Sequence, residues 1–187
     1  MALIAVLDAC VLIPAALRDA LLRTAEAGLY RVQWSDQILA EVERNLVEHG
    51  LAGPAAAQRL RSTMDAAFAE ASIPRERYDP LIPVMENHPK DRHVLAAAVA
   101  IGARLIVTSN LKDFPPQALR RHGIEAQHPD QFLAQLYELD AARVRQIIAD
   151  QAADLVAPPM TVDEVLDELA EQAPHFAALQ REAFSSA

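Results

Sequence analysis

The sequence is poor in cysteine and has no long uninterrupted apolar stretch. Its single cysteine, Cys10, excludes an intramolecular disulfide and argues against a zinc site built on cysteines. No stretch approaches the ~20 apolar residues that span a bilayer, and the first residues lack the basic segment of a signal peptide. Internal repeats and low-complexity segments are also missing. These absences predict a cytoplasmic protein that does not associate with membranes.

Acidic charge is concentrated in one part of the chain. The net charge of −9 arises from residues 125–187, which hold 12 acidic residues against 3 arginines, whereas residues 1–124 hold 14 of each sign. Such asymmetry indicates separate roles for the two parts, and it leaves the neutral part free to approach phosphate groups. With 52% hydrophobic residues among 187, the chain can bury the core of one α/β domain plus a modest appendage.

Apolar and amphipathic stretches alternate along the first two thirds of the chain. Residues 2–7 form a continuous apolar run, which is typical of a central parallel strand covered on both faces. The alternation of strands with helices predicts an α/β fold, a doubly wound parallel sheet flanked by helices. Four prolines within residues 73–90 predict a loop with one short extended piece. We expect further strands at 30–34, 104–108 and 124–128, and helices at 14–28, 35–49, 54–72, 91–102 and 116–122.

From Asp130 onward the pattern is helical only, with a break at Pro158 and Pro159. Thr161 and Glu164 have the spacing of a capping box, which predicts that a helix begins there. This helix should pack on another element, because it carries an apolar stripe formed by Val162, Val165, Leu166 and Leu169. Its many acidic residues either face water or act on a charged partner or on RNA, and both interpretations stay open.

Two of the predicted strands end in polar residues. Residues 2–7 run directly into Asp8, and residues 105–107 run into Thr108 and Asn110, with Asp113 just beyond. Ligands of open α/β sheets bind outside the carboxyl ends of the strands, where the strand order reverses. If the two strands are neighbours, Asp8, Asn110 and Asp113 meet at one edge. The alternative is that each polar residue only starts a turn, which is less convincing for two strands than for one.

Asp91 lies in line with the apolar face of its predicted helix. Helical spacing places it on the same side as Leu95, Ala98 and Gly102, the side expected to pack on the sheet. A carboxylate there faces a large desolvation cost unless a cation or hydrogen bonds compensate. The alternative is an ordinary N-cap, a role that aspartate often has.

Other polar residues near these positions have simpler interpretations. Glu41 lies beside the apolar stripe of its helix, where a solvated glutamate is expected, and Cys10 is a small buried hydrophobe. His88 and His93 could bind RNA or metal, although neither signal is specific. Three cations lie beside Asp91 and Asp113 and could hold phosphate or simply be solvated: Lys90, Arg92 and Lys112.

Taken together, these residues resemble the PIN-domain nuclease family, and specifically the VapC toxins of bacterial toxin–antitoxin pairs. Four stretches carry the resemblance in order, at residues 6–12, 35–41, 90–98 and 105–114. Each stretch alone matches the family only loosely, but the four stretches in this order are fairly specific for it. The resemblance covers about residues 1–130, which we expect to form a PIN domain, and residues 131–187 should form an all-α acidic C-terminal extension similar to that of some larger members.

The resemblance implies a metal-dependent endoribonuclease that cuts RNA phosphodiesters and is held by a cognate antitoxin protein, and it allows a homodimer. The implied catalytic residues are Asp8, Glu41, Asp91 and Asp113. Asp8, Asp91 and Asp113 would ligate Mg²⁺ or Mn²⁺, ions that prefer oxygen ligands, and Glu41 would orient the attacking water. The implied substrate-binding residues are Asn110, Thr108, Arg92, Lys90 and Lys112.

One departure from the family concerns Asn110. Many members have an aspartate at this position, whereas here the carboxylate follows three residues later, at Asp113. This pattern is similar to a PIN subfamily with Thr-x-Asn-x-x-Asp-Phe. Asn110 can coordinate through its carbonyl oxygen but brings no charge, so the sequence leaves the number of bound metal ions open.

Three other functions are associated with similar residue patterns. A structure-specific DNA nuclease could use a related carboxylate site, although no helix-hairpin-helix or long basic arm is evident. A phosphatase of the haloacid-dehalogenase type needs a second acid two residues after Asp8, where this chain has Cys10. A degenerate PIN fold kept as an interaction module is compatible with Asn110 and with the acidic extension.

Overall fold

The computed structural model describes residues 3–185, and these divide into two compact units. Unit 1 contains the chain up to Ile13 and Tyr30–Gln127, and unit 2 contains Pro14–Leu29 and His128 onward. The segment Pro14–Leu29, which precedes most of unit 1, therefore belongs with the C-terminal helices. The limits expected from the sequence, 1–130 and 131–187, stay a prediction.

Unit 1 is built on a sheet of five parallel strands in the order β3-β2-β1-β4-β5. The doubly wound α/β fold predicted from the sequence is confirmed. The strand β1 begins at Ile4, and Ala2 of the predicted strand lies outside the described residues. The strands are β1 (Ile4–Leu7), β2 (Arg31–Ser35), β3 (Ser72–Ile73), β4 (Leu105–Val107) and β5 (Glu125–Gln127).

The strand order reverses at β1. This strand pairs with β2 on one side and with β4 on the other, with Leu7 opposite Val107. The pairing continues one residue further, because the Asp8 N–H donates to the Val107 carbonyl at 3.1 Å. Asp8 and Thr108 thus follow neighbouring parallel strands at the same edge, which is where ligands of open α/β sheets bind. The predicted adjacency of these two strands is confirmed.

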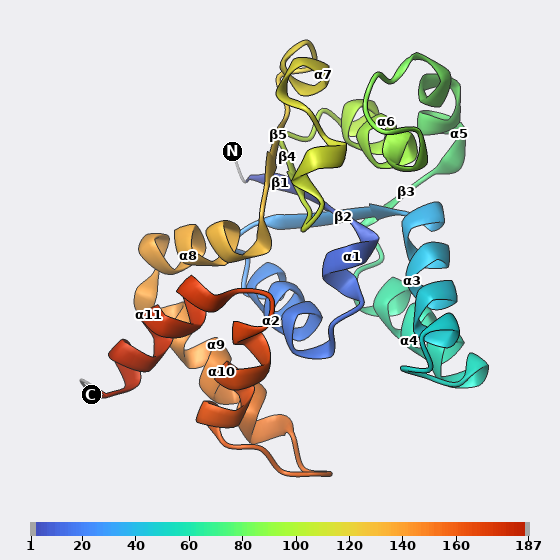
Figure 1. Ribbon diagram of the computed structural model, residues 1–187. Helices are drawn as coiled ribbons and strands as arrows, with labels where there is room; N and C mark the ends of the chain where they lie inside the picture. The colour runs from blue at the N-terminus through green and yellow to red at the C-terminus, as the bar shows by residue number, and fades with distance from the viewer. Residues whose placement is uncertain (1–2, 186–187) are drawn as a thin grey trace. The chain divides into compact units, whose positions relative to one another are not determined.

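Helices cover both faces of this sheet. The apolar helix α6 (Arg92–Ile101) packs on β1, β2 and β4, whereas α1 (Ala9–Leu12), α3 (Asp36–Glu48) and α4 (Pro54–Ala67) lie on the opposite side (Figure 1). Residues 93–98 of α6 are all buried, as expected for a helix against a sheet covered on both faces. The short α7 (Pro116–Arg120) packs beside β5.

Over residues 73–90 the predicted short extended piece is present, since Ile73 ends β3, but the predicted loop is wrong. This segment contains α5 (Arg75–Tyr78) and the 3-10 helices η1 (Asp79–Val84) and η2 (Pro89–Asp91). Proline is tolerated in the first turn of a helix, where its missing N–H would be unpaired in any case. Pro74, Pro80 and Pro89 therefore lie at the starts of these short turns, and Pro83 lies inside η1. The helix α4 is also shorter than predicted and ends at Ala67.

Apart from an isolated β-bridge between Val156 and Pro159, the regular elements in the described residues of unit 2 are all helices. In α10 the apolar stripe is confirmed: Val165, Leu166 and Leu169 are buried, and the helix packs on α2, α9 and α11 within the same unit. The Thr161–Glu164 capping box is also present. None of the described helices is long and apolar enough to cross a membrane. The helices of unit 2 are α2 (Ala15–Glu26), α8 (Pro129–Leu139), α9 (Ala141–Asp154), α10 (Val162–Ala170) and α11 (Pro174–Ser185).

The buried N-cap of α3 generates a prediction about stability. The Ser35 hydroxyl accepts the Ile38 N–H at 3.2 Å and is fully buried, so Ser35→Ala leaves a buried donor unpaired. We expect a loss of about 1 kcal/mol in the free energy of unfolding, measured by denaturant titration. Ser62→Ala is the matched control, because Ser62 is exposed in α4. Equal denaturation midpoints for the two variants would contradict this role of Ser35.

Candidate functional site

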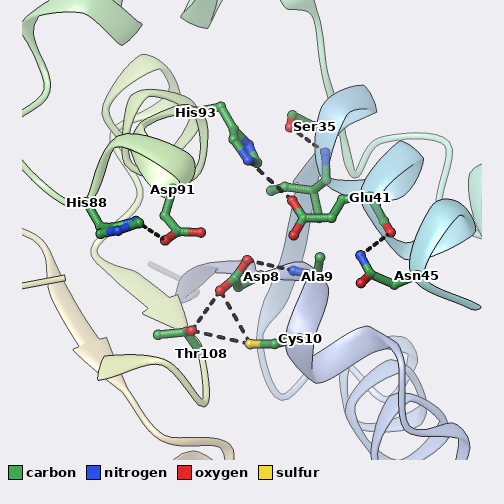
Figure 2. Close-up of polar contacts among 11 residues, drawn as sticks. Asp8, Ala9, Cys10, Ser35, Glu41, Asn45, His88, Asp91, His93 and Thr108 are labelled. Atoms are coloured by element: carbon green, nitrogen blue, oxygen red, sulfur yellow. Dashed lines mark hydrogen bonds and ion pairs between the residues drawn. The ribbon is translucent and has the colours of Figure 1, made fainter. Parts of the chain in front are cut away.

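Asp8 is the most buried acidic residue at the edge where β1 and β4 end. It is 3% exposed, and three donors hold its carboxylate (Figure 2). Oδ1 accepts the Ala9 N–H at 2.7 Å, and Oδ2 accepts the Thr108 hydroxyl at 2.7 Å and the Cys10 thiol at 3.4 Å. Burial raises the pKa of Asp8, and these hydrogen bonds oppose that rise. The carboxylate is therefore fixed in place although its charge is poorly solvated.

Thr108 and Cys10 join the two strand ends through hydrogen bonds. The Thr108 hydroxyl donates to Asp8 and accepts the Asn110 N–H at 3.0 Å. The Cys10 sulfur accepts the Ser109 N–H at 3.3 Å. Burial and the nearby Asp8 charge raise the pKa of the Cys10 thiol to about 12, so it is a neutral donor. The interpretation of Cys10 as only a small hydrophobe missed this role, whereas the substrate-binding role of Thr108 stays a prediction.

Asp91 occupies the N-cap position of α6, but its side chain makes no capping hydrogen bond. The carboxylate is 14% exposed, and its Oδ2 lies 3.4 Å from His88 Nδ1. Burial raises the pKa of Asp91, and the charges of Asp8, Asp113 and Glu41 raise it further. The capping explanation of Asp91 therefore fails, and the four predicted carboxylates lie close enough to interact electrostatically.

Glu41 projects from α3 toward Asp8 and has the opposite electrostatic environment (Figure 2). Its Oε2 lies 3.5 Å from Nε2 of the buried His93, and its side chain is 31% exposed. The hydrogen bond with His93 lowers the pKa of Glu41, and the positive charges of Arg44 and Lys90 assist. Glu41 therefore favours its ionised form, whereas Asp8 and Asp91 resist ionisation.

Asp113 and His88 lie close to Asp91. Asp113 ends the 3-10 helix η3 (Leu111–Asp113), and its carbonyl accepts the His88 N–H at 3.0 Å. His88, Asp91 and Asp113 each offer a ligand atom, and these atoms lie within 4.8 Å of one another. No specific signal in the sequence indicates His88, because its approach to Asp113 depends on how η2 and η3 lie in the folded chain.

The predicted phosphate-binding residues are neighbours of the carboxylates in the chain. Lys90 and Lys112 are exposed and lie next to Asp91 and Asp113 in the chain, and Asn110 is exposed as well. Arg92 is half-buried, and among residues 3–185 its Nε has no hydrogen-bond partner. Their contacts with substrate stay predictions.

The donor set fits a divalent cation. Carboxylate oxygens dominate it, as Mg²⁺ and Mn²⁺ prefer. Among the described residues, neither Asp8 nor Asp91 forms an ion pair with a lysine or arginine, and both pKa values are raised. A cation bound between them would compensate the buried negative charge. Asp8, Asp91 and Asp113 could hold it.

The raised pKa of Asp91 predicts a gain in stability on its neutralisation. Between the ordinary pKa of about 3.9 and the raised value, the folded state binds more protons than the unfolded state, so stability falls as pH rises. Asp91→Asn removes this loss. In EDTA at pH 7 we expect a higher thermal midpoint than for the wild type, by about 2–4 °C per kcal/mol, and no difference near pH 3.5.

Asp65→Asn, in α4 and outside the carboxylate cluster, is the control and should leave the midpoint unchanged at both pH values. A lower midpoint for Asp91→Asn in EDTA at pH 7 would show that repulsion among these carboxylates is not a cost of folding.

Comparison with known proteins agrees with this fold. A family model described as PIN domain matches residues 5–112, and one described as VapC50 C-terminal domain matches residues 129–182. A curated protein of Mycobacterium tuberculosis named "Putative ribonuclease VapC50" is 47% identical over 109 residues, which are 58% of this chain and 64% of that relative, less than two thirds of its length. None of the solved structures matches the chain. Because the PIN domain model spans more than half of the sequence, the chain belongs to the PIN-domain family.

Proposed function

We propose that this protein is a metal-dependent endoribonuclease and the toxin of a VapBC-type toxin–antitoxin pair. The observation that carries the proposal is the cluster of Asp8, Glu41, Asp91 and Asp113 at the switch point of the sheet, where their charges interact. The printed name of the curated relative, a ribonuclease of the VapC type, supports the same activity. RNA is then the substrate, and an antitoxin protein is the regulatory partner.

The metal ligands that we propose are Asp8 and Asp91, with Asp113 binding directly or through water. Their oxygen donors suit Mg²⁺ or Mn²⁺. Three hydrogen bonds hold the Asp8 carboxylate in one orientation before any ion arrives. A preorganised ligand of this kind loses little conformational entropy on binding.

Glu41 is the residue that we assign to the attacking water. Its pairing with His93 keeps it ionised and limits its movement, so it can accept a hydrogen bond from a water molecule beside Asp8. When bound, a divalent ion lowers the pKa of a water and offsets charge on the phosphodiester. Lys90, Arg92 and Lys112 would bind phosphates of the RNA, and Thr108 and Asn110 would contribute hydrogen bonds at the strand end.

A second function is supported by one observation. Asn110 stands where many relatives have an acid, which reduces the charge available for metal and favours a weakened PIN fold that acts as an interaction module. A DNA nuclease would use the same carboxylates on a different substrate. Both alternatives differ from the main proposal in what the protein cleaves, so a substrate comparison separates them.

Metal-dependent cleavage of RNA is the main expected result. Single-stranded and structured RNA should be cut in Mg²⁺ or Mn²⁺, cleavage should stop in excess EDTA, and it should return when either ion is restored. Asp8→Asn and Asp91→Asn should each lower kcat by at least about 10²-fold, because each removes a ligand charge next to the reacting phosphate. Mapping the ends of labelled products measures both the rate and the cleavage position.

Asp65→Asn serves as the matched control and should keep the wild-type rate. Cleavage that persists in EDTA, or wild-type rates for both Asp8→Asn and Asp91→Asn, would contradict the assigned site. Cleavage of DNA but not RNA would favour the DNA nuclease, and metal binding without cleavage of either would favour the interaction module.

The pair Asn110 and Asp113 provides a separate test of the ligand set. Asn110→Asp adds a carboxylate at the strand end and should strengthen Mn²⁺ binding, whereas Asp113→Asn removes one and should weaken it by about tenfold or more. Isothermal titration calorimetry with Mn²⁺ measures both changes. An unchanged Mn²⁺ affinity for Asp113→Asn would place the third ligand elsewhere.

A further inference from the structure

His88 provides a nitrogen donor at the edge of the carboxylate cluster. We propose that His88 binds the metal together with Asp91 and Asp113, forming a subsite that prefers a transition-metal ion such as Mn²⁺ or Co²⁺ over Mg²⁺. This inference rests on the proposed function, since it takes the carboxylate cluster to be a metal site, and it adds a ligand that carboxylates alone do not supply.

The distances are compatible with one ion between the three side chains. Donors bound at roughly 2.0–2.3 Å from an ion lie roughly 3 to 4.5 Å apart. His88 Nδ1 and Asp91 Oδ2 are 3.4 Å apart, and the donor atoms of all three residues lie within 4.8 Å of one another. Figure 2 shows the imidazole of His88 directly beside the Asp91 carboxylate. Only a small closure of the widest pair is needed.

The backbone fixes this arrangement without help from the side chains. The His88 N–H donates to the Asp113 carbonyl at 3.0 Å, and the Asp91 N–H donates to the His88 carbonyl at 2.9 Å. Pro89 follows His88 and disfavours helical backbone there, in agreement with its ψ of 132°. Three residues from two separate segments are therefore held as neighbours before an ion binds.

The chemistry of the donors indicates the kind of ion. Imidazole nitrogen suits transition metals, whereas Mg²⁺ prefers oxygen and retains several waters. The His88 side chain is 46% exposed, so an ordinary ion pair with Asp91 at the surface is the competing explanation. That explanation predicts no effect of His88 on metal affinity or on the choice of metal.

Calorimetric titration of the whole 187-residue chain with Mg²⁺, Mn²⁺ or Co²⁺ alone tests the proposal. For His88→Ala and His88→Asn we expect the Kd for Mn²⁺ and Co²⁺ to rise about tenfold or more, because even residues that only support a ligand cost about 10- to 100-fold. The Kd for Mg²⁺ should change by less than about threefold. His49→Ala, an exposed histidine at the end of α3, is the matched control.

A spectroscopic measurement that does not depend on activity completes the test. Pulsed electron paramagnetic resonance of bound Mn²⁺ should detect coupling to a histidine nitrogen in the wild type and in His49→Ala, and lose it in both His88 variants. Thermal midpoints in EDTA establish that the variants are folded. Two different replacements of His88 are used so that the test still stands if one variant does not fold.

The outcomes separate this inference from the proposed function. If Mn²⁺ binds the wild type and the His88 variants equally, or nitrogen coupling persists in the variants, His88 is not a ligand, although the carboxylate site stands. If the wild type binds none of the three ions, the metal site itself is wrong and both proposals fall.

Discussion

The candidate site depends on the parallel pairing of β1 with β4. This pairing sets Leu7 opposite Val107, so the residues that follow, Asp8 and Thr108, meet at one edge and form a hydrogen bond of 2.7 Å. The thiol of Cys10 joins both, because it donates to Asp8 and accepts from the chain after β4. A shift of one of these strands by one residue would turn its own side chains to the other face of the sheet. Asp8 is therefore the carboxylate whose position the sheet fixes, and the other three carboxylates of the cluster lie near it.

The cluster also carries a cost for the folded chain. Burial and mutual repulsion raise the pKa of Asp8 and Asp91, and no lysine or arginine of the described residues pairs with either. The surrounding apolar packing of α6 and of the central strands must offset that cost. A cluster of buried, mutually repelling carboxylates is typical of a functional site, because it lowers the stability of the folded chain and selection for stability alone would not produce it.

Part of this site could be predicted from the sequence. Asp8, Asn110 and Asp113 follow apolar strands, and Asp91 lies on an apolar helical face, so strand and helix periodicity are sufficient for them. Glu41 was predicted only from the family resemblance. Its position beside the apolar stripe of its own helix predicts an ordinary solvated glutamate. The hydrogen-bonding role of Cys10, the pairing of His93 with Glu41 and the approach of His88 to Asp113 were not predictable. Each depends on contacts between segments far apart in sequence.

Because α2 belongs to unit 2 but lies between two parts of unit 1 in the sequence, dividing the chain at one position cannot separate the two units. The chain leaves unit 1 after Ile13, contributes α2 to unit 2 and returns at Tyr30. In unit 2 the Gln151 side chain donates to a carbonyl of α2, and Arg23 of α2 pairs with Asp154 at 2.9 Å. The family model for the C-terminal domain begins at residue 129 and omits this helix. A chain shortened to its PIN portion would keep α2 without the helices α9 and α10 on which α2 packs, so the apolar face of α2 would be exposed. An exchange of C-terminal regions between relatives therefore has to include α2.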